Sequence, residues 1–208
     1  MSAHRNDVGG GTIAAESLLL GIAEGLTGKR CPRASLRLRQ LAGHLPEPAV
    51  DPLDDLVAVA ALMRSELRPR PDGGLLLPDV LRAGVGHPAA IVVAAAAAAR
   101  ARGMLVAVVG HGPRTWLAHE RPCEPFIVDP IEPDGLVDGR TLGVDLHWRC
   151  AHDLALGTLD LIVARGERAG DLCGALAAAR LRCELATAHG RAVDDAVHEL
   201  RRLRARLN

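Results

Sequence analysis

Four side chains between residues 111 and 129 have the atom types that covalent catalysis requires. Cys123 offers a nucleophilic sulfur, and either His111 or His119 could act as a base. Asp129 offers a carboxylate that could orient an imidazole. Each also has a simpler interpretation, since Asp-Pro is a common turn former, loop histidines are usually solvated, and a cysteine on a turn lacks the helix dipole that activates a thiol. All four are candidate site residues.

Four other motifs are better explained without a site. HERPC at 119–123 and CAHD at 150–153 contain metal-ligand atoms, but neither has the paired spacing of a structural zinc site. GLTGK at 25–29 lacks the glycine spacing and the hydroxyl residue of a phosphate loop, and it is typical of a helix C-terminus. RRLRARL at 201–207 is typical of a solvated helix face, although a basic helix could also dock on an acidic partner. The sequence predicts neither a metal nor a cofactor.

A buried helix between Gly84 and Gly103 must position these candidates. His87-Pro88 favours a helix start, because proline is preorganised for the first helical turn. Residues 89–99 carry almost no polar atom, so this helix cannot face water on any side. The run is shorter than the ~20 apolar residues of a membrane span. Its many alanines let neighbouring elements pack closely around it.

Helical spacing is found on both sides of this central helix. On the N-terminal side it predicts helices over 12–28, 34–41 and 53–67. Thr12 is the expected N-cap of the first, and Asp51 is that of the third. We expect the third helix to bury Leu56, Val59, Ala60 and Met63. On the C-terminal side, helices are predicted over 148–164, 169–185 and 193–207, with a turn at 166–170.

Three short runs after the central helix predict a small sheet. The runs at 104–110, 114–120 and 125–129 are rich in β-branched or aromatic residues and are separated by turn signals. Residues 68–74 and 130–145 are expected to be irregular. The predicted fold class is therefore α+β and mainly helical, with a buried central helix on an antiparallel β-meander and a C-terminal helical hairpin.

Composition excludes several classes of function. Basic and acidic residues number 25 each, so no overall field attracts nucleic acid or an anionic membrane. One Phe, two Trp and no Tyr leave few platforms for stacking bases. The first residues lack the pattern of a secretory signal, and five cysteines without a CxxC suit reduced thiols. We expect a cytoplasmic protein that binds neither nucleic acid nor membrane.

The order of these parts resembles a known family. LLLPDVL at 75–81, GHPAAIVV at 86–93, GPRTWLAH at 112–119 and FIVDP at 126–130 look like the SirB1 type of transglutaminase-like protein. The helices at 150–185 are similar to the TPR-like pair that follows the core in that family. Residues 1–11 are polar and end in three glycines, which predicts a flexible arm. Helical spacing predicts an N-terminal helical part at 12–67, and the resemblance implies a transglutaminase-like core at 68–145 and a TPR-like helical part at 146–208.

Active members of this fold class use a Cys-His-Asp arrangement. In this sequence the helix-start cysteine position falls at Pro88, and the strand histidine position falls at Thr115. Neither residue can supply the missing chemistry, whereas Asp129 stands where the pattern places its carboxylate. A remaining cleft lined by Pro88, Arg114, Thr115 and Trp116 beside this carboxylate could still hold a ligand.

The resemblance therefore implies two functions. The first is a catalytically degenerate protein that acts as a binding or regulatory partner for a protein or a small metabolite. The alternative is a remodelled enzyme that uses His111 or His119 with Asp129, and Cys123 as nucleophile. Such an enzyme would carry out acyl transfer, amide hydrolysis or cyclisation on a small metabolite.

Overall fold

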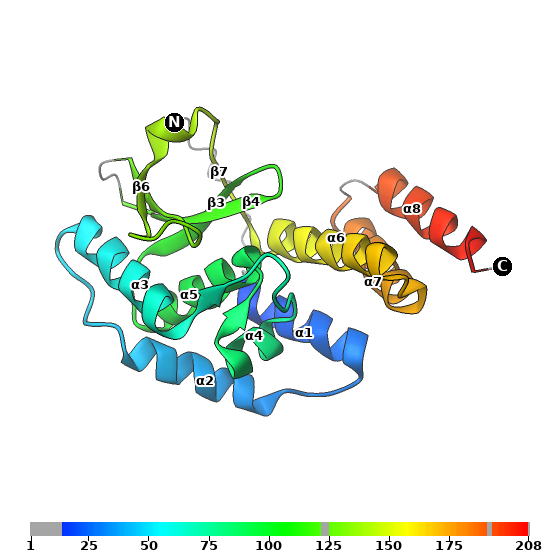
Figure 1. The fold of residues 1–208 in the computed structure, drawn as a ribbon, viewed down its shortest axis with the longest axis horizontal. Helices are drawn as coiled ribbons and strands as arrows, with labels where there is room; N and C mark the ends of the chain where they lie inside the picture. The colour runs from blue at the N-terminus through cyan, green and yellow to red at the C-terminus, as the bar shows by residue number, and fades with distance from the viewer. Residues whose placement is uncertain (1–13, 122–124, 191–192, 208) are drawn as a thin grey trace.

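Helix α5 (Pro88–Ala101) lies at the centre of the molecule, as predicted. The structure is a computed structural model, and it describes residues 14–121, 125–190 and 193–207. Every residue from Ala90 to Ala99 is buried, which matches the absence of a polar face in the sequence. In Figure 1, α3 and α5 lie beneath a small sheet, and three C-terminal helices extend to one side. The predicted fold class, α+β and mainly helical, is confirmed.

From residue 14 onward, four helices precede α5 and pack with it into one core. Their bounds are α1 (Ala15–Thr27), α2 (Pro32–Gly43), α3 (Pro52–Glu66) and α4 (Leu77–Ala83). The Asp51 carboxylate caps α3 by accepting the N–H of Leu53 at 2.9 Å, as predicted. The four residues expected inside α3 are all buried. The predicted arm 1–11 and the predicted cap Thr12 lie outside the described residues.

The sheet is larger than predicted. The three expected strands are β3 (Val106–His111), β4 (Arg114–His119) and β5 (Phe126–Val128). Two more strands, β6 (Leu136–Asp138) and β7 (His147–Trp148), give the antiparallel order β6-β5-β4-β3-β7. A 3₁₀ turn, η1 (Gly139–Leu142), follows β6. The expectation that 130–145 is wholly irregular was therefore wrong, because strands of two or three residues are too short to show a periodicity.

The two faces of the sheet have different neighbours. Val108, Leu117 and Val128 on one face join the core formed around α5. Val109, Trp116 and Ile127 form a second cluster on the other face, where Leu142 and Leu146 pack against it. The segment after β6 therefore covers this outer face of the sheet.

A short parallel pair precedes α5 where a loop was predicted. β1 (Arg68–Pro69) pairs with β2 (Val85–Gly86) directly before the start of α5. Gly73 passes so close to this pair that a Cβ atom on it would lie 2.5 Å from the carbonyl carbon of Gly86. A side chain at residue 73 would collide with backbone, so this close approach requires glycine.

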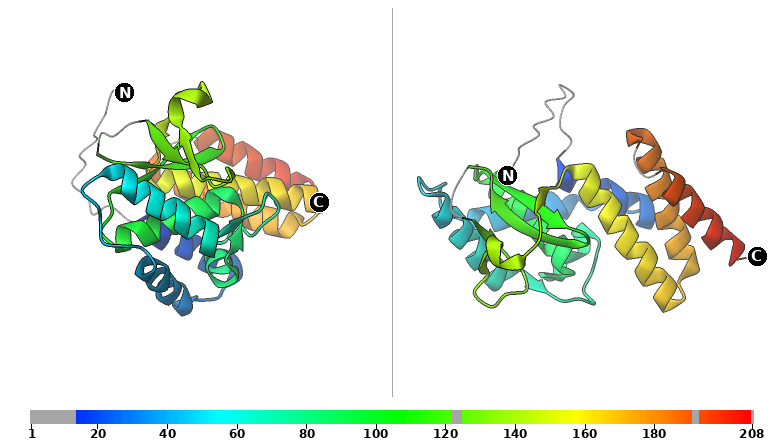
Figure 2. Two further views of the ribbon diagram at one scale, coloured as in Figure 1. Left: turned by 60° about the vertical axis from the view of Figure 1, so that its left-hand side comes forward. Right: turned by 90° about the horizontal axis from the view of Figure 1, so that it is seen from above.

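The C-terminal part consists of α6 (Ala151–Ala169), α7 (Leu172–His189) and α8 (Val193–Ala205), drawn yellow to red in Figure 2. α6 begins after β7 and not at Trp148. It also continues through Gly166, where a Cβ atom would lie 2.9 Å from the Asp171 carbonyl oxygen of the connection to α7. The predicted turn is therefore confined to the end of α6, at Gly170 (φ 76°).

Two of the sequence motifs have structural roles in this part. In CAHD, the Sγ of Cys150 accepts the N–H of Asp153 at 3.4 Å, and the Asp153 carboxylate accepts the N–H of Cys150 at 3.3 Å. This reciprocal capping box starts α6. In the basic run, Arg202 and Arg206 both bind the carboxylate of Glu167 on α6 at 2.6 Å. Part of the basic face therefore holds α8 to the rest of the chain.

None of the helices in the described ranges has the length and apolar character needed to cross a lipid bilayer.

Candidate functional site

The Asp129 carboxylate follows β5 and is buried, with 3% of the residue exposed. Its Oδ2 atom accepts the indole N–H of Trp116 at 2.6 Å, and its Oδ1 atom accepts the N–H of Ile131 at 2.8 Å. The backbone N–H of Asp129 also donates to the carbonyl of Gly135 at 2.8 Å. Both carboxylate oxygens are thus already used by groups from the sheet and from the turn that follows it.

Arg114 completes this cluster on the solvent side. Its guanidinium lies 3.4 Å from Oδ2 of Asp129 and 4.9 Å from the centre of the Trp116 ring. The cation over an aromatic face is a favourable arrangement. Because the Arg114 side chain is 60% exposed, its ion pair adds little stability. The structure therefore brings together three predicted site residues, Arg114, Trp116 and Asp129.

The other two predicted cleft residues lie elsewhere. Thr115 precedes Trp116 in β4, and alternation along a strand places its side chain on the opposite face of the sheet. Pro88 is the first residue of α5 and is half-buried. The proposed positions for the base and the nucleophile therefore belong to the core side of the sheet, whereas Trp116 and Arg114 belong to its outer side.

His119 has a different carboxylate partner from the one expected. Its Nε2 atom lies 3.3 Å from Oδ2 of Asp55 on α3, and its Nδ1 atom accepts the N–H of Arg121 at 3.0 Å. Because Nδ1 is an acceptor, Nε2 carries the hydrogen and donates it to Asp55. The second Asp55 oxygen accepts the N–H of Ala49 at 2.8 Å. The predicted pairing of His119 with Asp129 is therefore replaced by a buried network that involves Asp55.

Asp55 is a buried carboxylate that was not among the predicted site residues. It lies in the first turn of α3, where negative charge also interacts favourably with the helix dipole. Its spacing from Val59 and Leu62, four and seven residues later, is that of the buried face of α3. That spacing was the available signal that this carboxylate lies inside the protein.

The remaining two candidates are His111 and Cys123. His111 is exposed near the β3–β4 turn, and its Nδ1 atom lies 3.1 Å from the backbone oxygen of Asp145. Cys123 lies outside the described residues. No imidazole within the described ranges hydrogen bonds to the Asp129 carboxylate.

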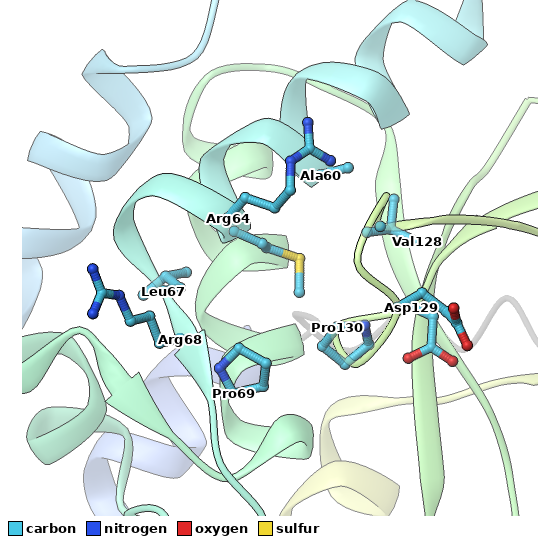
Figure 3. A pocket seen from close by; sticks show the side chains of 11 residues that line it. Ala60, Arg64, Leu67, Arg68, Pro69, Val128, Asp129 and Pro130 are labelled. Atoms are coloured by element: carbon cyan, nitrogen blue, oxygen red, sulfur yellow. The ribbon is translucent and has the colours of Figure 1, made fainter.

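A cavity of about 70 Å³ lies beside Asp129. Figure 3 shows Leu67 and Pro69 on one side of it and Val128, Asp129 and Pro130 on the other. At ~30 Å³ per water molecule this volume holds about two waters, whereas ligand pockets usually exceed ~300 Å³. None of the four predicted cleft residues lines it. This cavity is too small for a metabolite.

His87, which precedes Pro88, is a second residue whose role was not predicted. Its Nδ1 atom caps α5 by accepting the N–H of Ala89 at 3.3 Å. Burial lowers the pKa of this imidazole, and the nearby Arg165 guanidinium lowers it further. Arg165 is itself held by the carbonyl oxygens of Gly73 at 2.6 Å and Pro71 at 3.2 Å. The helix start that resembles a nucleophile position is therefore capped by a neutral imidazole.

This lowered pKa predicts a pH-dependent part of the stability. In the unfolded chain His87 has its ordinary pKa of about 6.5, so below that pH the unfolded chain binds a proton more readily than the folded one. The contribution is therefore complete above about pH 6.5 and is lost as the pH falls toward the folded-state pKa. We expect urea unfolding to show a smaller acid loss of stability in His87→Asn, which keeps a capping oxygen. Equal pH profiles for the two proteins would contradict the assignment.

Among the residues that the structure describes, no group of three or more His, Cys, Asp or Glu side chains is placed to hold a metal ion. Comparisons of the chain with protein-family models, curated proteins and solved structures found no match. The function must therefore be argued from the geometry.

Proposed function

We propose that this chain is a SirB1-type transglutaminase-like protein that lacks thiol catalysis and acts as a binding or regulatory partner. The observation that carries the proposal is the state of the Asp129 carboxylate. In a working Cys-His-Asp site this group orients an imidazole. Here its oxygens accept hydrogens from Trp116 at 2.6 Å and Ile131 at 2.8 Å instead.

The surrounding residues support the same proposal. The expected nucleophile and base positions are Pro88 and Thr115, which cannot supply a thiolate or an imidazole. His119 is buried and hydrogen bonded to Asp55, so it has no access to a substrate. Pro88 and Thr115 carry no catalytic group, and the Asp129 carboxylate is fully hydrogen bonded. Both observations support a transglutaminase-like fold without catalysis.

The absence of thiol catalysis predicts a result for chemical labelling. We expect that none of the five cysteines of the native chain labels rapidly at pH 5 to 6, where an ordinary thiol of pKa about 8.5 is protonated. Mass spectrometry would give the rate at each cysteine between about pH 5 and 9. Cys150, the exposed N-cap of α6, serves as the internal reference for a helix start alone.

One outcome would favour the remodelled enzyme instead. A cysteine that labels much faster than Cys150 at the acid end, Cys123 above all, would have an activating neighbour beyond a helix dipole. That result would contradict the proposed loss of thiol chemistry. It would make acyl transfer, amide hydrolysis or cyclisation the function to test next.

The binding part of the proposal has a separate test on α8. Arg202 and Arg206 are used within the chain, but the exposed Arg201 and Arg204 have no partner in the described residues. These two guanidiniums suit an acidic partner surface. Affinity capture with the full chain should retain a partner that the Arg201→Glu/Arg204→Glu double variant loses. Retention by both proteins alike would contradict binding through this face.

A further inference from the structure

A second and larger cavity lies away from Asp129. Its volume is about 320 Å³, and it forms where the ends of α3 and α4 meet α2 and the β1–β2 pair. The polar side chains in its wall are Arg37, Ser65, Glu66, Arg68 and Arg82. The volume corresponds to about ten water molecules and lies at the lower end of the range for ligand pockets. It therefore suits a small and polar ligand.

The charges in this wall are not balanced. Arg37 binds one oxygen of the Glu66 carboxylate at 2.9 Å, and the His44 imidazole lies 3.5 Å from the other. Arg82 binds the Asp79 carboxylate at 2.7 Å. The Arg68 guanidinium has no hydrogen-bond or ion-pair partner among residues 14–121, 125–190 and 193–207. Arg68 lines both cavities, and Figure 3 shows its guanidinium directed away from Val128 and Pro130. One guanidinium thus remains available at the larger cavity.

The backbone at this cavity narrows the class of ligand. Both α3 and α4 end here, and helix C-termini carry partial negative charge. The two ends approach closely at Gly84, where φ is +64° and a Cβ atom would lie 2.8 Å from the carbonyl oxygen of Glu66. A ligand with negative charge alone would be repelled by these ends. A ligand with an anionic group and several hydroxyl donors could bind the Arg68 guanidinium with the first and the partially negative helix ends with the second.

We propose that this cavity binds a small phosphorylated sugar or polyol. The phosphate is held by the planar fork of Arg68, since guanidinium and phosphate match in a bidentate arrangement. The hydroxyl groups donate to the remaining lone pairs of the Glu66 carboxylate oxygens and exchange hydrogen bonds with Ser65. Such a ligand would be the small-metabolite partner of the proposed function, but the inference stands on this cavity and not on the loss of thiol chemistry.

Calorimetric titration of the full chain tests this inference with glucose 6-phosphate as the probe. We expect saturable binding of glucose 6-phosphate, and much weaker binding of glucose and of inorganic phosphate. Arg68→Gln should weaken glucose 6-phosphate binding by about tenfold or more, as expected for loss of a charge-assisted hydrogen bond. Arg68→Lys keeps the charge and loses the planar fork, so its affinity for glucose 6-phosphate should lie between those of the unchanged protein and Arg68→Gln.

The matched control is Arg70→Gln. Arg70 is exposed on the same segment and does not line the cavity, so its loss should change the affinity by less than about twofold. Equal weakening in Arg68→Gln and Arg70→Gln would indicate unspecific charge attraction and overturn the proposal. Absence of saturable binding at millimolar glucose 6-phosphate, or equally tight binding of glucose, would also overturn it. Circular dichroism establishes that each variant is folded.

Discussion

Replacing Asp129 with alanine is expected to lower the free energy of unfolding by about 3 kcal/mol. The substitution leaves the indole N–H of Trp116 buried without an acceptor, and it removes the acceptor of the Ile131 N–H. An unsatisfied buried donor costs about 1 to 3 kcal/mol, and the Trp116 donor is the more deeply buried of the two. Urea denaturation followed by fluorescence or circular dichroism measures the loss.

The control for Asp129 lies three residues further along the chain. Glu132 lines the same small cavity but is exposed, so Glu132→Ala should change the stability by less than about 0.5 kcal/mol. If Asp129→Ala were as stable as Glu132→Ala, the carboxylate would be free of a structural role. The main support for a non-catalytic frame would then be lost.

Replacing Asp55 with alanine is expected to have the larger effect, a loss of about 4 kcal/mol. His119 Nε2–H and the N–H of Ala49 would both lose their acceptor, and the His119 side chain is fully buried. Asp55→Asn should lose less, because one oxygen remains. The NH₂ group of the new amide is itself a donor, so it would face the donor N–H of either His119 or Ala49. Equilibrium unfolding in urea again gives the difference.

Asp54 provides the comparison for this network. It is the neighbouring carboxylate in the first turn of α3 and is exposed. Asp54→Ala removes only a favourable charge at the helix N-terminus, which is worth about 0.3 to 1 kcal/mol. A similar small loss in Asp55→Ala would show that the His119–Asp55 pair contributes little and that His119 is available for other chemistry.

The central helix and the caps could be predicted because their signals lie in consecutive residues. His87-Pro88 and the apolar run to Ala99 define the start and the burial of α5 without reference to any partner. Asp51 before α3 is a similar local signal. The meander strands β3, β4 and β5 were predicted because each run shows its β-branched or aromatic residues within a few positions.

The short strands could not be predicted in the same way. β1, β2 and β7 have two residues each, so their only strand property is the neighbour with which they pair. β7 is a strand because Trp148 lies opposite Val109 of β3, and this register is decided by the path of the chain between them. In the sequence alone, Trp148 was assigned to the helix that follows.

The candidate site also combines features that could be predicted from the sequence with pairings that depend on distant segments. In the sequence, the family resemblance placed Arg114 and Trp116 beside Asp129, and the antiparallel pairing of β4 with β5 brings these three residues together. Only the tertiary structure decided that the Asp129 carboxylate is used by Trp116 and that His119 is used by Asp55, 64 residues away. A buried polar group must pair with whatever donor or acceptor shares its water-free space, and packing of distant segments determines that partner.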